Sequence, residues 1–247
     1  MRQETSTPGS EPVDRRRELM RRLLADVGLG GDAPEGGIPV RDQAAATPLS
    51  AAQRSLWLHH QAHPESTSYN GCLVIELTGP LDGTALATAL HGLAMRHEIL
   101  RTVYRVGDNG TPHQVVAEAP KADIPLRDLT AVPPTERRHT ADAVAVALAS
   151  RPFDLAHEHP VRWELLRFAA DAHALVQVVH HIAWDGGTWG VLSRDLAALY
   201  RAAVAGQDAP AAPEVQYADF AAWQRSREPD PADTADKGTT DTDTADK

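Results

Sequence analysis

Two adjacent histidines followed by an aspartate are the residues of this sequence best suited to acid–base chemistry. His180 and His181 end the apolar run "ALVQVV", and Asp185 follows four residues after the second histidine. This pattern could supply a base with an orienting acid, could hold a metal ion, or could only mark the end of a strand. An imidazole with an ordinary pKa of about 6.5 is largely neutral at pH 7, so it could remove or guide a proton there.

Alternation along the predicted strand argues against a metal ion between the two histidines. Adjacent strand residues point to opposite faces of a sheet, so one ion cannot easily be held by both His180 and His181. No third ligand follows at a recognised spacing. His59 and His63, at i and i+4, form another candidate pair, but the sequence identifies no partner for them. We therefore expect no metal site.

A catalytic histidine fits the pattern better. A residue at the end of a strand, where the chain leaves the sheet, can present its imidazole to a substrate. Asp185 and Gly186 would then form a tight turn before the next helix. The aspartate could orient a histidine directly, or could fix the loop by pairing with an arginine. A strand that ends in polar residues before an Asp-Gly turn is also common, so spacing alone leaves the structural interpretation open.

The elements that must position these residues mix helical and strand patterns without regular β-α-β alternation. Ser50 with Gln53 forms a capping-box pattern that opens a helix, and Asp82 is placed to cap another. Because hairpins dominate, the sequence predicts an α+β fold, a two-layer sandwich of a mostly antiparallel sheet with packed helices. Helices are predicted from Ser50, over 83–97, over 135–150, around 189–200 and over 215–225, and strands around 72–75, over 99–106 and 113–119, and as two strands within 161–181 with a turn at 170–172.

The chain divides into a leader, a compact domain and a tail. Residues 1–46 are rich in Pro, Gly, Ala and charge, except for an amphipathic helix predicted over about residues 14–28. This helix could dock an upstream protein, or it could only cover the chain's own core. Compact sequence spans residues 47–227. Residues 228–247 contain no aromatic or large aliphatic residue, so we expect a disordered tail.

Composition narrows the classes of function. The chain has 24 Lys and Arg against 34 Asp and Glu, and a formal net charge of -10 disfavours binding to nucleic acid or to an anionic membrane. Cys72 is the only cysteine, so neither a disulfide framework nor a thiolate zinc cluster can form. The sequence shows no signal-peptide pattern and no apolar run of membrane-spanning length. We expect a cytoplasmic protein.

The stretch "HHIAWDG" matches the HHxxxDG signature of the condensation domains of nonribosomal peptide synthetases, part of the wider group of chloramphenicol-acetyltransferase-like acyltransferases. Three further stretches, "PLSAAQRSLW", "RHEILRTVY" and "YADFAAWQR", resemble the family's other N-terminal motifs in the same order. The resemblance covers about residues 47–227. It implies a chloramphenicol-acetyltransferase-like fold, with one lobe present of the usual two, because no motif of the second lobe follows.

Carried over residue by residue, the resemblance implies that His181 is the catalytic histidine and His180 the supporting one. The family's aspartate falls on Asp185, which would hold the loop through an ion pair, with Arg101 as the first candidate partner and Arg96 as the second.

The resemblance also assigns roles to the residues after the aspartate. Gly186 would give the backbone room to turn toward the substrate channel. The sequence departs from the usual DGWS at Gly187 and Thr188, and Trp189 would supply the displaced aromatic bulk.

The implied reaction is amide formation between two substrates that are tethered to carrier proteins. The α-amine of an aminoacyl group on a downstream carrier would attack the acyl or peptidyl thioester on an upstream carrier, with His181 as base or as positioning group. The phosphopantetheine arms belong to the carriers, so no cofactor is expected on the domain, and a partner could supply a separate C-terminal lobe. Two alternatives stay open: a carrier-protein-binding or scaffold module without turnover, and a small acyl-CoA acyltransferase acting as a trimer.

Overall fold

The computed structural model describes residues 37–228 of the chain. The helix predicted at about residues 14–28 lies outside this part, and so does the predicted tail after its first residue. The compact unit starts at Pro39, earlier than the predicted boundary after residue 46.

Arg41 explains why the compact unit starts early. Its guanidinium donates to the carboxylates of Glu98 and Asp219, each at 2.8 Å, and its side chain is only 9% exposed. Because these two acids come from distant parts of the sequence, one arginine ties the first described segment to both.

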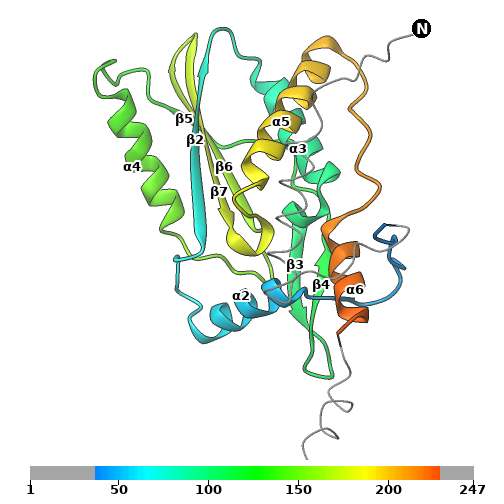
Figure 1. Ribbon diagram of the computed structural model, residues 1–247. Helices are drawn as coiled ribbons and strands as arrows, with labels where there is room; N and C mark the ends of the chain where they lie inside the picture. The colour runs from blue at the N-terminus through cyan, green and yellow to red at the C-terminus, as the bar shows by residue number, and fades with distance from the viewer. Residues whose placement is uncertain (1–36, 229–247) are drawn as a thin grey trace, which may run out of the picture. The chain divides into compact units, whose positions relative to one another are not determined.

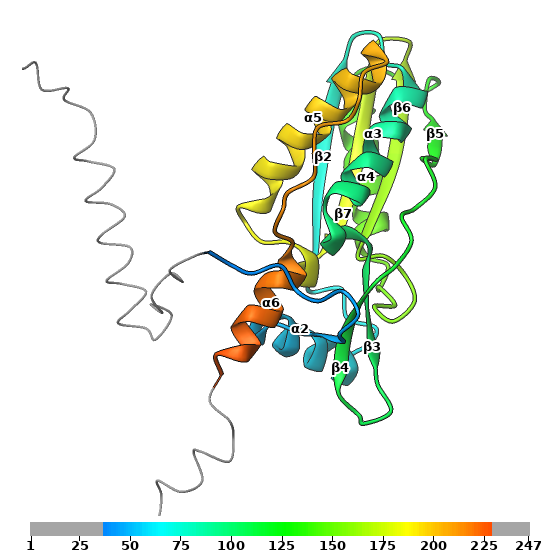
Figure 2. The same ribbon diagram turned by 90° about the vertical axis from the view of Figure 1, so that its right-hand side faces the viewer.

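The larger sheet has four strands (Figures 1 and 2). Its strand β7 ends at His180, and His181 follows directly. Strand β2 pairs antiparallel with β7 along its whole length, with Asn70 opposite His180. The β6–β7 hairpin turns at Ala170 and Asp171, as predicted. Only β5 runs parallel to its neighbour, β6. The strand order is β2 (Asn70–Thr78), β7 (Ala172–His180), β6 (Val161–Ala169) and β5 (Leu126–Asp128).

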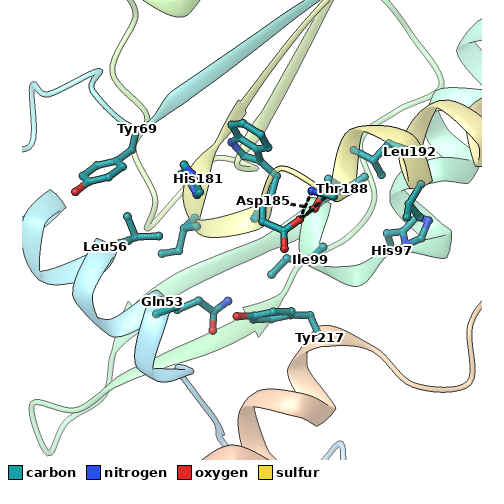
Figure 3. Close-up of a pocket in the computed structure, with 17 residues that line it drawn as sticks. Gln53, Leu56, Tyr69, His97, Ile99, His181, Asp185, Thr188, Leu192 and Tyr217 are labelled. Carbon is teal, nitrogen blue, oxygen red and sulfur yellow. Dashed lines mark hydrogen bonds between the residues drawn. The ribbon is translucent and has the colours of Figure 1, made fainter. Parts of the chain in front are cut away.

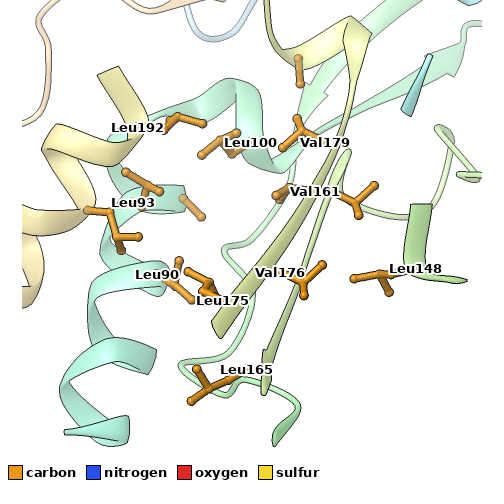
Figure 4. Close-up of a cluster of buried hydrophobic side chains, with 14 of the residues drawn as sticks. Leu90, Leu93, Leu100, Leu148, Val161, Leu165, Leu175, Val176, Val179 and Leu192 are labelled. Atoms are coloured by element: carbon orange, nitrogen blue, oxygen red, sulfur yellow. The ribbon is translucent and has the colours of Figure 1, made fainter. Parts of the chain in front are cut away.

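Helices cover both faces of this sheet (Figure 1). Helices α3 (Gly83–Arg96) and α5 (Thr188–Ala205) lie on one face, and α4 (Arg137–Ala149) lies on the other. Leu175 of β7 faces Leu90, whereas the next residue, Val176, faces Leu148 (Figure 4). The α+β class and the mostly antiparallel sheet are confirmed, with helices on both faces. This arrangement explains why β7 is a continuous apolar run rather than an alternating one.

A smaller sheet has the order β1 (Thr47–Pro48), β4 (Pro112–Val116) and β3 (Thr102–Val106). The strand predicted from residue 99 is shorter than expected, because the segment Glu98–Arg101 forms a 3₁₀ turn, η1. The Thr102 hydroxyl donates to the Glu98 carbonyl at 2.8 Å, and the Glu98 N–H donates to the Gln216 side chain at 3.1 Å. Local and distant polar groups therefore replace strand pairing at this point.

The helices of the first and last motifs lie against each other. Helix α2 (Ala51–Ala62) begins with the predicted capping box of Ser50 and Gln53. Helix α6 (Tyr217–Ser226) contacts it through Tyr217, whose hydroxyl lies 2.9 Å from the Ser50 hydroxyl. None of the described helices combines the length and apolarity that crossing a bilayer would need.

Candidate active site

His181 begins the 3₁₀ turn η2 (His181–Ala183), which leads from β7 toward α5. Its backbone N–H donates to the Tyr69 carbonyl at 2.7 Å, so the turn is tied to the residue before β2. Its side chain is exposed, and within residues 37–228 neither ring nitrogen has a hydrogen-bond partner. Figure 3 shows the imidazole among Tyr69, Leu56 and Asp185. His181 is thus held by its backbone, with both nitrogens free.

His180 points the other way, into the core, as strand alternation predicts. It is 3% exposed, and its Nδ1 accepts the Ile182 N–H at 3.1 Å. Burial, with smaller contributions from the neighbouring His60 and His181, lowers the pKa of His180 to about 4. The ring is therefore neutral at pH 7, and what it does is hold the backbone of the turn.

A pocket of about 680 Å³ lies beside His181 (Figure 3). Helices α2, α5 and α6, both 3₁₀ turns and Tyr69 all contribute to its wall. The pocket is within the size range of small-molecule sites, and its wall is mostly apolar. Motifs that are far apart in the sequence therefore meet around this one pocket. Its apolar wall includes Leu56, Ile99, Ile182, Val191 and Leu192.

Asp185 fixes its own loop through local hydrogen bonds. Its Oδ1 accepts the N–H groups of Gly187 and Thr188, each at 3.0 Å, and the Thr188 hydroxyl at 2.7 Å. In return the Thr188 hydroxyl accepts the Asp185 N–H at 3.0 Å. The Thr188 hydroxyl is the main cause that lowers the pKa of the Asp185 carboxyl. This reciprocal pair, the Asp185–Thr188 cap, closes the turn that leads into α5, whose N-cap residue is Gly187. The departure from DGWS at Thr188 thus supplies the partner of Asp185.

The prediction that Asp185 pairs with Arg101 or Arg96 is wrong, because within residues 37–228 both arginines bind other partners. Arg101 donates instead to the backbone carbonyls of Ala94, at 3.2 Å, and of Ala117, at 2.6 Å. Its guanidinium is used to satisfy carbonyls at the end of α3 and after β4, and the cap already satisfies Asp185.

Arg96 joins α3 to α5 rather than to the loop. Its Nε and the Nε2 of His97 lie 2.8 Å and 2.9 Å from the same Oδ2 of Asp195. Burial by itself would raise the pKa of Asp195, but hydrogen bonds from Arg96 and His97 hold it below its ordinary value. His97 also lines the pocket. The only sequence signal for it was its place beside Arg96 in "RHEILRTVY".

Near the two histidines the structure requires a glycine at position 71 but not at position 186. A Cβ on Gly186 would meet no atom within 4 Å, and its φ is not positive. A Cβ on Gly71 would overlap the indole of Trp184. Trp189, expected to supply aromatic bulk, packs on that same indole with ring centroids 4.8 Å apart. The aromatic bulk after the histidines therefore lies on the bare backbone of β2.

Replacing Asp185 by alanine is expected to destabilise the fold by about 1 kcal/mol, because the Gly187 N–H and the Thr188 hydroxyl lose their acceptor and the Thr188 N–H keeps only the Asp185 carbonyl, at 3.1 Å. Asp185→Asn keeps an acceptor oxygen and should lose less. Since the folded carboxyl has a lowered pKa, its contribution is present above the unfolded pKa and is lost as the pH falls through the folded value. Urea unfolding at pH 7 measures the difference, and equal stability of wild type and Asp185→Ala would contradict the capping role.

No group of three or more His, Cys, Asp and Glu side chains is arranged to hold a metal ion in the described part of the chain. The rings of His59 and His63 do lie together, with centroids 5.0 Å apart, next to Tyr69 rather than to a further ligand.

Known proteins are similar in sequence to this chain. A family model described as the condensation domain matches residues 43–236. The isonitrile lipopeptide synthase of Mycobacterium tuberculosis is 41% identical over 210 residues, covering 82% of this chain and 8% of that protein. The phosphinothricin tripeptide synthetase PhsC of Streptomyces viridochromogenes is 39% identical over 194 residues, covering 78% of this chain and 18% of that protein. The chain thus spans a small part of these relatives.

Solved structures share the fold. The X-domain from teicoplanin biosynthesis has a TM-score of 0.66 and 30% identity, covering 84% of this chain and 42% of that chain. The first condensation domain of the calcium-dependent antibiotic synthetase, in complex with a substrate analogue, has a TM-score of 0.66 at 24% identity, covering 74% of this chain and 43% of that one. The second likeness shows the fold alone, and both confirm the predicted fold. With the family model matching most of its length, the chain belongs to the condensation-domain family.

Proposed function

We propose that this chain is the N-terminal lobe of a condensation active site, which joins a carrier-tethered acyl or peptidyl donor to a carrier-tethered aminoacyl acceptor. The observation that carries the proposal is the exposed His181 imidazole beside a mostly apolar pocket, with no hydrogen-bond partner for either ring nitrogen among residues 37–228. A neutral imidazole in this position can accept a proton from an amine.

The reaction moves one proton from the amine to the departing sulfur and needs no covalent enzyme intermediate. The acceptor α-amine attacks the donor thioester carbon, a C–N bond forms, and His181 accepts the proton that the amine loses. The tetrahedral intermediate then collapses, the C–S bond breaks, and the proton goes to the departing sulfur. His181 could instead position the amine and stabilise the developing charge. Holding both tethered substrates together supplies much of the rate.

The partners in this proposal are upstream and downstream carrier proteins, whose phosphopantetheine arms bring the substrates. The lobe itself needs no bound cofactor. Because the chain covers 42% or 43% of two structures with its fold, we further propose that a C-terminal lobe completes the pocket.

The test is a condensation assay with two carriers, one loaded with an acyl donor and one with an aminoacyl acceptor. The full chain is incubated with them alone and with a C-terminal condensation lobe added as a separate protein, and the intact mass of the acceptor carrier is followed. We expect condensed product when both lobes are present. Lack of product in both arms, with the lobes shown to associate, would contradict the proposal.

A second candidate function is protein binding without turnover. A solved complex of the X-domain and OxyB from teicoplanin biosynthesis matches this chain with a TM-score of 0.66 at 32% identity, so a related domain engages a protein partner. In the same assay, a scaffold would bind a loaded carrier, measurable by a titration, and would release no product with either lobe arrangement.

A further inference from the structure

We propose that Trp184 is a positioning residue that orients the His181 imidazole by ring stacking and leaves both of its nitrogens free for the tethered substrates. This inference rests on the proposed function of His181. Trp184 occupies one of the unspecified positions of HHxxxDG, so the motif itself assigns it no role.

Aromatic rings are what orient the exposed imidazole. The ring centroids of His181 and Trp184 lie 4.8 Å apart with an interplanar angle of 31°, a tilted stack within the usual spacing of aromatic pairs. Tyr69 approaches edge-on, at 6.3 Å and 89°. An exposed side chain without hydrogen bonds would otherwise sample several rotamers. Stacking restrains the ring without using the nitrogens, which a hydrogen bond to the protein would occupy.

The Trp184 side chain is itself held in place by its neighbours. Trp189 packs against it at 4.8 Å, and Gly71 leaves the space that the indole fills. The Trp184 indole N–H is buried and has no hydrogen-bond partner within the described residues. A glycine inside a strand and an unpaired buried donor both cost stability. A phenylalanine at this position would avoid the unpaired donor. Stability alone therefore does not account for an indole here, whereas the need for a wide ring surface against the imidazole does.

The test compares Trp184→Leu with Trp184→Phe in the full chain, and Trp163→Leu serves as the matched control. Trp163 on β6 also has a buried indole N–H without a described partner, so its loss is a similar change to the core. The readout is the NMR signals of the His181 ring protons, assigned from their absence in His181→Ala. We expect Trp184→Leu to move these signals toward those of an unstacked histidine, Trp184→Phe to keep most of the displacement, and Trp163→Leu to leave them in place.

Gly71→Ala tests the same contact from the β2 side of the indole, because its added methyl group must push the Trp184 indole aside. It also covers the case in which Trp184→Leu does not fold. We expect Gly71→Ala to move the His181 signals too. Unmoved signals in every variant that folds would overturn the stacking.

The condensation assay tests the functional half. We expect Trp184→Leu to lower kcat by roughly tenfold to a hundredfold, as for a misplaced catalytic group, with KM nearly unchanged and with rescue by Trp184→Phe. If the His181 signals move but kcat is unchanged, the stack exists but does not position the imidazole for catalysis. Full activity of His181→Ala would instead overturn the proposed role of His181, and the NMR result would be unaffected.

Discussion

Replacing His181 by alanine is expected to lower the condensation rate by about 10²- to 10⁴-fold, the usual contribution of a positioned acid–base group. The melting temperature should change little, because the His181 side chain is exposed, makes no hydrogen bond within residues 37–228 and loses only its ring contacts with Trp184 and Tyr69. The rate is measured by the mass of the acceptor carrier with both lobes present. A loss of rate without a loss of stability separates chemistry from folding.

Two further variants sharpen this result. His181→Gln supplies an amide N–H donor but cannot accept a proton. The variant should therefore stay slow if the histidine is a base, and it should recover part of the rate if the histidine only positions the amine. His180→Ala should give the opposite signature, a loss of stability, because the Ile182 N–H loses its buried acceptor. Full activity of His181→Ala would remove this residue from the mechanism.

Replacing Asp195 by alanine is expected to lower the free energy of unfolding by about 3 kcal/mol, since removing one partner of a buried ion pair leaves the other charge uncompensated. The Asp195 side chain is 8% exposed and that of Arg96 is 19% exposed. Asp142→Ala is the matched control. It breaks the pair of Asp142 and Arg138, whose side chains are 53% and 72% exposed, and should change stability by less than about 1 kcal/mol.

The same cluster predicts how stability depends on pH. Asp195 has a lowered pKa when folded, so its contribution is present above the unfolded pKa and is lost as the pH falls through the folded value. Burial is the main cause of the lowered pKa of His97, and on acidification the unfolded histidine takes up its proton first. Both groups therefore destabilise the fold as the pH falls. Urea unfolding at pH 7 and pH 2 should show a larger loss for wild type than for Asp195→Ala, and equal losses would contradict the role of this carboxylate.

Periodicity and capping in the sequence were enough to locate the main elements. Ser50 and Asp82 cap helices as predicted, and the β6–β7 hairpin turns where expected. The opposite directions of His180 and His181 also followed from strand alternation alone. These features depend on residues a few positions apart, which a single sequence displays directly.

Strand β5 and the start of β3 were not predicted correctly. Strand β5 consists of three exposed residues that are held by parallel pairing with β6 and by the ion pairs of Arg127 with Glu164 and of Asp128 with Arg167. It therefore has no periodic pattern of its own. The residues before Thr102 turn instead of extending, because Gln216, far along the chain, contacts Glu98.

The sequence by itself determined the family, the class of fold and the candidate histidine, because these follow from motifs and local patterns. Only the tertiary structure decided which charges and rings meet. Arg96 pairs with Asp195 and not with Asp185, since the loop aspartate is satisfied by its own cap while α5 brings a buried carboxylate to the end of α3. Likewise Gly71 matters because Trp184 folds over it. Such contacts join segments that are distant in the chain, and a local pattern carries no information about which distant groups will be brought together.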